Sequence, residues 1–387
     1  MIIRIFTTCI VLFLSISLVG QVDVRKQFEF AAEQYLRMLA SHPDQTQSPQ
    51  STNPDGTPNN RSSDWWCSGF FPGSLWYIYE FTGDSKWKEA ANRWTMALEK
   101  EQYNTGTHDL GFMLYCSFGN GYRLTKNDNY KHIMLSGAKS LATRFDPKVG
   151  LIKSWNLFQK IYTYPVIIDN MMNLEFLLWA AKETGNKEFY NICVTHANNT
   201  LKNHFRADNS SYHVVCYGPN GEVLAKKTHQ GAADESAWAR GQSWGLYGYT
   251  VMYRETRDVK YLTQAHEIAS FIINNPNLPS DKIPFWDYSK PGEERDASAA
   301  AIAASALLEL SQYSNKKLKK EYIAMATKML ESLSGPVYRA KSGENNNFIL
   351  MHCTGHKPGN SEIDVPLVYA DYYFLEALMR YRKIMHK

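Results

Sequence analysis

The sequence predicts an all-α protein in which helical hairpins close into a toroid, an (α/α)6 barrel. Two observations lead to this prediction. A short polar turn that opens with Thr or Ser recurs at irregular intervals, as in helical repeats. Strongly apolar helical stretches precede these turns, and stretches of mixed polarity follow them. Because a helix that is apolar on all sides is buried and one with a polar face meets solvent, the pattern predicts six inner and six outer helices.

The first twenty residues predict a secretory signal that is not part of the fold. Arg4 precedes the mostly apolar run 5–16, and small residues stand at 17–20. The run is too short to span a membrane. No cysteine stands at the expected cleavage point near Gly20, so a lipid anchor is not indicated. We therefore expect residues 21–387 to form a single exported, periplasmic domain without a stable membrane span.

Polar turns mark the boundaries between the predicted helices. They lie at 82–87, 125–130, 184–189, 256–261 and 314–318. The predicted inner helices are 70–81, 109–124, 169–183, 240–255, 297–313 and 366–381. The predicted outer helices follow the turns, and one more, 24–39, precedes the first inner helix. Strand signals are scarce: only 212–222 predicts a small hairpin, and 41–64, rich in Pro, Ser, Asn and Thr, predicts a loop.

The composition is that of a globular protein, with 44% apolar and 21% charged residues. The net charge of +4 is too small and too dispersed to predict a nucleic-acid partner, although it favours an anionic substrate. The cysteines beyond the signal are Cys67, Cys116, Cys193, Cys216 and Cys353. Their number is odd and their spacing matches no zinc or redox motif, so we expect buried thiols with room for one disulfide bridge, and neither a metal nor a cofactor. The 24 Tyr and 10 Trp suit a sugar-binding cleft, although core packing uses such rings too.

A toroid brings the beginnings of all inner helices to one mouth. Polar and aromatic residues at or just before these positions are Trp65, Trp66, His108, Asp109, Asp169, Asn170, Trp238, Arg240, Gln242, Trp244, Arg295, Asp296, Ser361 and Asp364. Taken singly, each Asp has an alternative role as a helix cap and each Trp as a core residue. Carboxylates, an arginine and several tryptophans in one funnel together predict a saccharide-processing site for an anionic substrate.

Asp169 is the centre of this prediction. It follows the apolar run 165–168 and precedes a predicted helix. Burial beside Val166, Ile167 and Ile168 disfavours the charged form of the carboxyl group and raises its pKa toward the range that a general acid needs. A second carboxylate nearby, that of Asp109, acts in the same direction.

Four strings carry a resemblance to a known family: WWCSGFFPGSLW (65–76), HDLGFMLY (108–115), IIDNMMNLEFLLWA (167–180) and HQGAADESAWARGQSWGLYGY (229–249). With them the chain resembles the unsaturated glucuronyl hydrolases, glycoside hydrolase family 88, over essentially the whole mature sequence. The resemblance implies an (α/α)6 barrel that acts on unsaturated uronyl oligosaccharides, some of them sulfated, which polysaccharide lyases release. It also implies that the C4=C5 enol ether of the terminal uronic acid is hydrated, in place of ordinary displacement at the glycosidic bond.

The resemblance further implies roles for individual residues. Asp169 takes the position of the general acid and base, and Asp109 that of its partner. The positions that meet the unsaturated ring fall on Trp66, His108, His213, Gln230, Arg240 and Trp244. Arg240 is the expected partner of the uronate carboxylate, because a guanidinium group binds carboxylates with two parallel bonds. His213 and Gln230 are expected to bond ring substituents and the attacking water, with His229 as a competing candidate.

The segment 352–359 is the candidate for binding a sulfate on the next sugar. His352, His356 and Lys357 supply its charge. The alternative is a solvated basic loop, since the Ser/Lys pattern associated with sulfate-tolerant family members is not clearly present.

Three other functions stay open on the sequence alone. One is an unsaturated rhamnogalacturonyl hydrolase of family 105, which would act on pectin fragments. Another is a periplasmic glycan-binding protein without turnover, which the presence of both Asp109 and Asp169 argues against. The third is an epimerase of N-acylated sugars, which would need a pair of catalytic histidines at matching helix starts, and the sequence shows no such pair. The sequence carries no signal for an oligomeric state.

Overall fold

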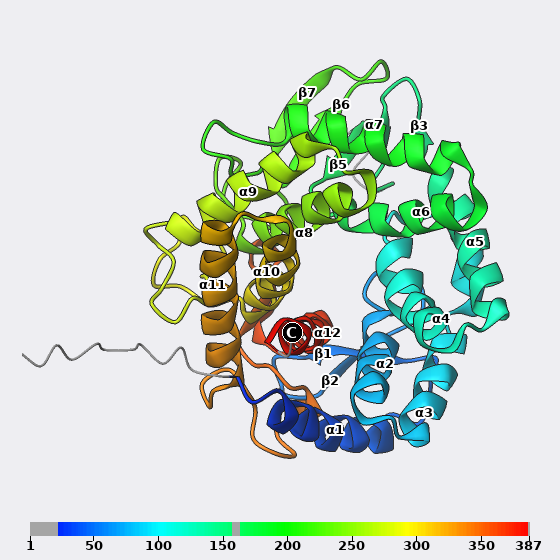
Figure 1. Ribbon diagram of the computed structural model, residues 1–387, viewed down its shortest axis with the longest axis vertical. Coiled ribbons are helices and arrows are strands. Elements are labelled where there is room, and N and C mark those ends of the chain that lie inside the picture. The colour runs from blue at the N-terminus through cyan, green and yellow to red at the C-terminus, as the bar shows by residue number, and fades with distance from the viewer. Residues whose placement is uncertain (1–21, 157–162, 386–387) are drawn as a thin grey trace, which may run out of the picture.

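The computed structural model describes residues 22–156 and 163–385, so the predicted signal lies outside the described residues. The described chain is mostly helical, as expected. Its inner helices are α2 (Phe70–Thr82), the π-helix η2 (Gly111–Gly119) continued by α4 (Asn120–Thr125), α6 (Asn170–Thr184), α8 (Ala239–Thr256), α10 (Ala297–Leu310) and α12 (Val368–Met385). Each contacts the next in this order, and α12 returns to contact α2, so the inner helices close a ring. Figure 1 shows this ring.

The outer helices lie around the ring (Figure 1). They are α1 (Val24–Ser41), α3 (Ser85–Met96), α5 (Asp128–Ala142), α7 (Lys187–Asn203), α9 (Val259–Asn274) and α11 (Lys316–Ser334). Their burial follows the predicted polarity: α3 buries Trp87, Ala90 and Trp94 on one face, whereas in α10 nearly every residue is buried. The predicted helices are thus confirmed, with ends that differ by a few residues. α10 stops at Leu310, and a 3-10 turn, η3 (Ser311–Tyr313), follows it.

The recurring turns explain how each hairpin is made. The opening hydroxyl donates to the carbonyl four residues earlier, as from Thr82 Oγ1 to Ile78 O at 2.8 Å and from Thr184 Oγ1 to Ala180 O at 2.7 Å. The Asp or Asn near the middle of the turn then caps the following helix, as Asp84 accepts from the backbone N–H of Lys86. The turn therefore satisfies a free carbonyl of one helix and a free N–H of the next.

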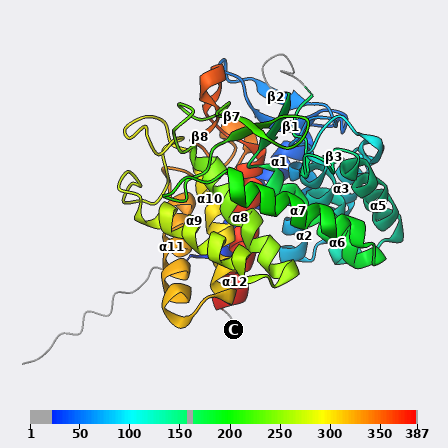
Figure 2. The ribbon, with the colours of Figure 1, turned by 90° about the horizontal axis from the view of Figure 1, so that it is seen from above.

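Short strands cover one end of the ring. They form the hairpins β1–β2 (Ser48–Thr52, Pro58–Arg61), β3–β4 (Phe145–Asp146, Leu151–Ile152) and β8–β9 (Cys353–His356, Ser361–Val365), and the sheet β5–β6–β7 (Tyr164–Ile167, Val214–Tyr217, Val223–Lys227). Figure 2 shows β1, β2, β7 and β8 at the end opposite the C-terminus. The predicted hairpin at 212–222 exists, shifted to β6 and β7.

The expectation of a loop at 41–64 was wrong in part, because β1 and β2 pair there. These strands read SPQST and PNNR and lack alternating polarity, so the sequence pattern gave no strand signal. The sequence left room for one disulfide bridge, and this was also wrong. The five cysteines of the described chain are free and buried. No helix among residues 22–156 and 163–385 is long and apolar enough to cross a membrane.

An aromatic layer crosses the middle of the ring. Phe112 packs against Trp66 and Trp244, with ring centroids 5.5 and 5.2 Å apart, and Trp66 lies 5.0 Å from Tyr369. We call the end where the inner helices begin the N-terminal mouth and the end where they finish the C-terminal mouth. The aromatic layer lies between the two.

Candidate active site

Asp169 lies at the N-terminal mouth, where β5 leads into α6. The backbone of β5 pairs with β6, and the N–H of Ile168 bonds His213 O at 3.0 Å, so the position of Asp169 is fixed by a buried sheet. Its carboxylate makes no helix-capping bond, which argues against the simple cap that the sequence left open. Burial raises its pKa to about 7; the charge of Arg240 opposes this shift and that of Asp109 adds to it.

Asp109 lies immediately before η2 and is as buried as Asp169. Burial raises its pKa to about 7, against hydrogen bonds from Thr107 and Asn173 that lower it. Thr107 Oγ1 stands 3.2 Å from Asp109 Oδ2, and Asn173 Nδ2 stands 3.5 Å from Oδ1. Two carboxyl groups with pKa near 7 therefore share one mouth, and each can hold or release a proton near neutral pH.

His108 constrains the protonation of Asp109. Its Nδ1 lies 2.7 Å from the carbonyl oxygen of Ser154, and because a carbonyl only accepts, Nδ1 carries the proton. Burial lowers the pKa of His108 to about 3, so the ring is neutral and Nε2 is a bare acceptor. That nitrogen stands 3.2 Å from Asp109 Oδ1. Only the protonated form of Asp109 can donate to it.

His213 has the opposite tautomer. Its Nδ1 accepts from the backbone N–H groups of His229 and Gln230, at 3.1 and 3.0 Å, so the proton lies on Nε2. Burial lowers the pKa of His213 well below its usual value. Nε2–H lies 3.8 Å from Asp169 Oδ2, too far for a hydrogen bond, and neither atom has another partner among the described residues. The two histidines therefore offer an acceptor to Asp109 and a donor to Asp169.

Arg240 is held by three hydrogen bonds within the protein. Its guanidinium group is buried, with Nη1 2.9 Å from Asp296 Oδ2 and 2.6 Å from Thr354 O, and with Nη2 2.6 Å from Gly355 O. Three of its five N–H donors are thus engaged, whereas Nε has no partner among the described residues, so the binding of a uronate carboxylate by Arg240 stays a prediction. Its charge still acts on the site, because it lowers the pKa of Asp169.

Trp66 and Trp244 form the floor of the mouth. Trp244 is fully buried, and its indole nitrogen has no hydrogen-bond partner among the described residues. The same indole lies near enough to Asp169 to lower the pKa of that carboxyl, without a formed bond. Trp66 is only partly buried, so it is the more accessible of the two rings. Trp244 closes the site from below.

The chain matches the family model described as Glycosyl Hydrolase Family 88 over residues 40–381. It is 48% identical over 327 residues to an unsaturated glucuronyl hydrolase of Formosa agariphila, covering 83% of this chain and 81% of that one. It is 31% identical over 332 residues to an unsaturated chondroitin disaccharide hydrolase of Streptococcus agalactiae, with 82% and 81% covered. A solved unsaturated glucuronyl hydrolase specific for heparin superposes with a TM-score of 0.91 at 49% identity, over 94% and 98% of the two chains.

The chain belongs to glycoside hydrolase family 88. It is therefore a glycoside hydrolase, and the resemblance drawn from its four sequence strings is confirmed. Among the described residues, no group of three or more His, Cys, Asp and Glu side chains is arranged to hold a metal ion.

Loop residues complete the mouth of this family 88 enzyme. Gln230 Nε2 donates to Gly355 O at 3.0 Å, the carbonyl that Arg240 also binds. The ring of His356 packs on that of His229, with centroids 4.4 Å apart. Lys357 pairs with Glu293 at 2.8 Å and with Glu294, so its charge is already compensated.

Two residues of this region were missed by sequence reasoning. Asn173 lies one helical turn after Asp169 on the same face, a spacing that could have revealed it; it donates to Asp109 and accepts from the N–H of Phe112 at 3.1 Å. Glu362, on β9, accepts from Gln50 and from Ser51, and burial raises its pKa. No sequence signal marks Glu362, because β8 and β9 fold back in a register that only the tertiary structure sets.

Proposed function

We propose that this family 88 hydrolase removes the 4,5-unsaturated uronic acid from the non-reducing end of lyase-generated glycosaminoglycan oligosaccharides by hydrating the C4=C5 enol ether. The observation that carries the proposal is the pair of buried carboxyl groups, Asp109 and Asp169, with pKa values near 7 at one mouth. Protonation of a carbon atom needs a carboxylic acid that is neutral near neutral pH. The names of the relatives support the same substrate class.

In the proposed reaction, Asp169 gives its proton to C4 as water adds to C5. The ionised Asp169 then takes a proton from the attacking water, so the group returns to its starting state. The product is a hemiketal at C5, which opens and releases the uronic acid as a keto acid. His213 Nε2–H, 3.8 Å from Asp169 Oδ2, is placed to stabilise the ionised form of Asp169 between the two proton transfers.

Asp109 acts as the partner that keeps its own proton. Its protonated form donates to His108 Nε2, which limits the negative charge at the mouth and leaves Asp169 as the group that exchanges protons. Trp66 walls the unsaturated ring. Gln230 and His213 bond ring substituents and water. Arg240 supplies positive charge through space and holds the Thr354 and Gly355 carbonyls in place.

Several finer assignments belong to the same proposal. The closed ring of inner helices is an (α/α)6 barrel, a reading supported by the order of helix contacts. Residues 1–20 are a secretory signal, and the enzyme works in the periplasm. Heparin-type fragments are the favoured substrates, because the solved relative at 49% identity is described as specific for heparin. His356 and Lys357 stand near the entrance, where a sulfate on the second sugar would lie.

A spectroscopic assay tests the proposal. The purified protein is mixed with unsaturated disaccharides from heparan sulfate, chondroitin, hyaluronan and pectin, and the ultraviolet absorbance of the conjugated enol ether is followed. Loss of absorbance with the glucuronyl substrates, fastest with the heparin-type one, is the expected result. Turnover of the pectin fragment alone would overturn the substrate assignment, and binding without any turnover would overturn the catalytic one.

A further inference from the structure

The C-terminal mouth holds a cavity of about 920 Å³. Its wall takes side chains from α2, η2, α4, α6, α8 and α12, and it includes neither Asp109 nor Asp169. Phe112 lines the cavity and packs on Trp244, so the aromatic layer separates this space from the candidate active site. Its volume falls in the range of small-ligand sites.

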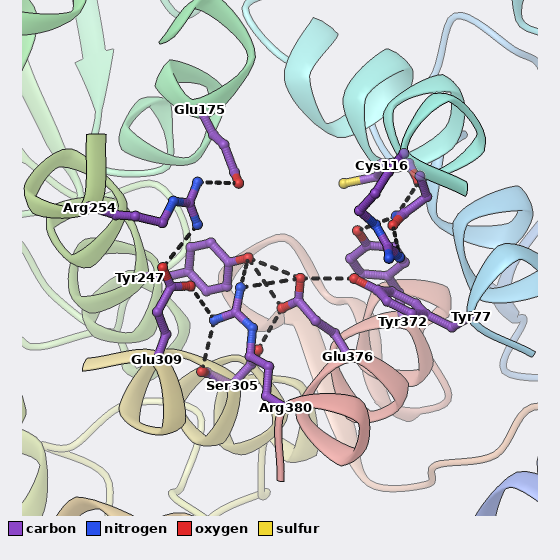
Figure 3. Close-up of polar contacts among 12 residues, drawn as sticks. Tyr77, Cys116, Glu175, Tyr247, Arg254, Ser305, Glu309, Tyr372, Glu376 and Arg380 are labelled. Carbon is purple, nitrogen blue, oxygen red and sulfur yellow. Dashed lines mark hydrogen bonds and ion pairs between the residues drawn. The ribbon is translucent and has the colours of Figure 1, made fainter. Parts of the chain in front are cut away.

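The charged groups deep in this mouth are largely bonded to one another (Figure 3). Glu376 accepts from Tyr77 and Tyr247, each at 3.0 Å, and from Ser305. Glu309 pairs with Arg254 at 2.9 Å and with Arg380 at 2.7 Å. Their charges are therefore compensated within the protein.

Glu175 keeps an acceptor available. Its Oε1 binds Arg254 at 2.6 Å, while no described residue donates to Oε2. Glu175 lines the cavity and is half-buried. Hydroxyl groups of a ligand are suitable donors to such an oxygen.

Half-buried aromatic rings form one side of the cavity. Trp179 lies between Tyr115 and Tyr122, with ring centroids 6.1 and 6.0 Å away. All three line the cavity, and none is fully buried. Aromatic faces of this kind pack against the apolar faces of sugar rings.

The rim of the cavity carries uncompensated positive charge. Lys126, Lys182 and Lys383 line it, are exposed, and make no ion pair within the described part of the chain. The acidic residues at the same rim are neutralised: Glu80 pairs with Arg123 at 2.6 Å, and Glu183 pairs with Lys131 at 2.7 Å. The rim therefore attracts an anion.

We propose that the C-terminal mouth binds an acidic oligosaccharide of two or three sugars, at a site separate from the catalytic one. The aromatic side takes the sugar rings, Glu175 Oε2 accepts from a hydroxyl group, and the rim lysines meet sulfate or carboxylate groups. A neutral sugar has no anionic group to bind the rim lysines. A free inorganic anion has no ring to pack against the aromatic side chains. The inference does not depend on the reaction at the N-terminal mouth.

Calorimetric binding of a saturated, sulfated disaccharide tests the proposal, because this probe lacks the C4=C5 bond and is not turned over. The double variant Lys182→Glu with Lys383→Glu is expected to raise the Kd by about tenfold or more, since two attractive contacts become repulsive. Trp179→Ala is expected to weaken binding without any change in charge. The matched control is Lys319→Glu with Lys320→Glu, two exposed lysines on α11 outside the cavity.

Three results would overturn the inference. One is equal affinity of the rim and control variants. Another is loss of binding in Trp66→Ala with retention in the rim variant, which would place the ligand at the N-terminal mouth. The third is full displacement by inorganic sulfate at equal concentration, which would indicate an ion site only. Thermal unfolding of each variant verifies its fold, and the turnover assay with unsaturated substrates tests the catalytic proposal separately.

Discussion

Asp169 at the N-terminal mouth and Glu309 at the C-terminal mouth have pKa values shifted in opposite directions. At the N-terminal mouth, burial raises the pKa of Asp109 and Asp169 to about 7. At the C-terminal mouth, Glu309 is half-buried, and Arg380 and Arg254 outweigh the effect of burial and lower its pKa, whereas burial raises the pKa of its neighbour Glu175. Helix dipoles would favour the reverse, since helix beginnings stabilise negative charge and helix ends oppose it.

This difference shows that burial and direct charge partners shift the pKa of a carboxyl group more than the helix dipole does. A helix dipole contributes about 0.3–1 kcal/mol to a nearby charge, whereas a shift from 3.8 to about 7 corresponds to several kcal/mol. The direct partners therefore decide the charge state. Glu309 has two guanidinium groups within 3 Å, whereas Asp169 has a neutral histidine at 3.8 Å and an arginine already bonded elsewhere. Glu309 is therefore held as a fixed charge, whereas Asp169 can exchange a proton near neutral pH.

The largest expected effect concerns proton exchange at Asp169. Asp169→Asn keeps the shape of the side chain but cannot deliver a proton, so we expect kcat/KM to fall by about 10²–10⁴-fold. The fall is measured by loss of ultraviolet absorbance, with circular dichroism to verify the fold. A variant as active as the parent would show that another group supplies the proton.

The second largest effect is expected from the ion pairs of Glu309 at the C-terminal mouth. Glu309→Ala removes one partner each from Arg254 and Arg380, which keep Glu175, Glu255 and Glu376, and losing a hydrogen bond to a charged group costs about 1.5–3 kcal/mol. We expect the free energy of unfolding in urea to fall by this amount at pH 7. Because the folded pKa of Glu309 lies below its unfolded value of 4.5, the difference from the parent should shrink as the pH falls below that value and through the folded pKa. A constant difference across pH would contradict the assignment.

A smaller effect of opposite sign is expected at Asp109. A carboxyl group with a raised folded pKa contributes stability below its unfolded pKa of 3.8 and loses that contribution as the pH rises through about 7. Asp109→Asn stays neutral and can donate to His108 Nε2 at every pH. We expect it to raise the free energy of unfolding by on the order of 2 kcal/mol at pH 8 and by little at pH 4. Destabilisation at pH 8 would mean that the ionised form fits the site.

The smallest effect is expected at the entrance. Lys357 is partly exposed and paired with two glutamates, so Lys357→Ala should change stability by less than about 1 kcal/mol. If Lys357 also binds sulfate, KM for a sulfated disaccharide should rise by about threefold or more, relative to the unsulfated one. Equal KM ratios in variant and parent would leave Lys357 as a surface residue.

The local sequence determined the helical hairpins of this protein and their order. The Thr or Ser at each turn bonds back to the preceding helix and the following Asp or Asn caps the next, so hairpins and their order were predictable from residues close together in the chain. The burial of Asp169 was predictable for the same reason, because its apolar neighbours Val166 to Ile168 are adjacent in sequence. The four strings that carry the family resemblance are likewise contiguous.

Only the tertiary structure determined the tautomers of the site histidines and the bonding of Arg240, because these depend on contacts between distant segments. The tautomers of His108 and His213 are set by Ser154 and by the backbone at 229–230, and the bonds of Arg240 are set by Asp296 and residues 354–355. None of these partners is near in sequence, so no periodicity or motif could reveal them. A protonation state is a balance of burial and charge in three dimensions, whereas a helix and its cap are decided within a few residues of the chain.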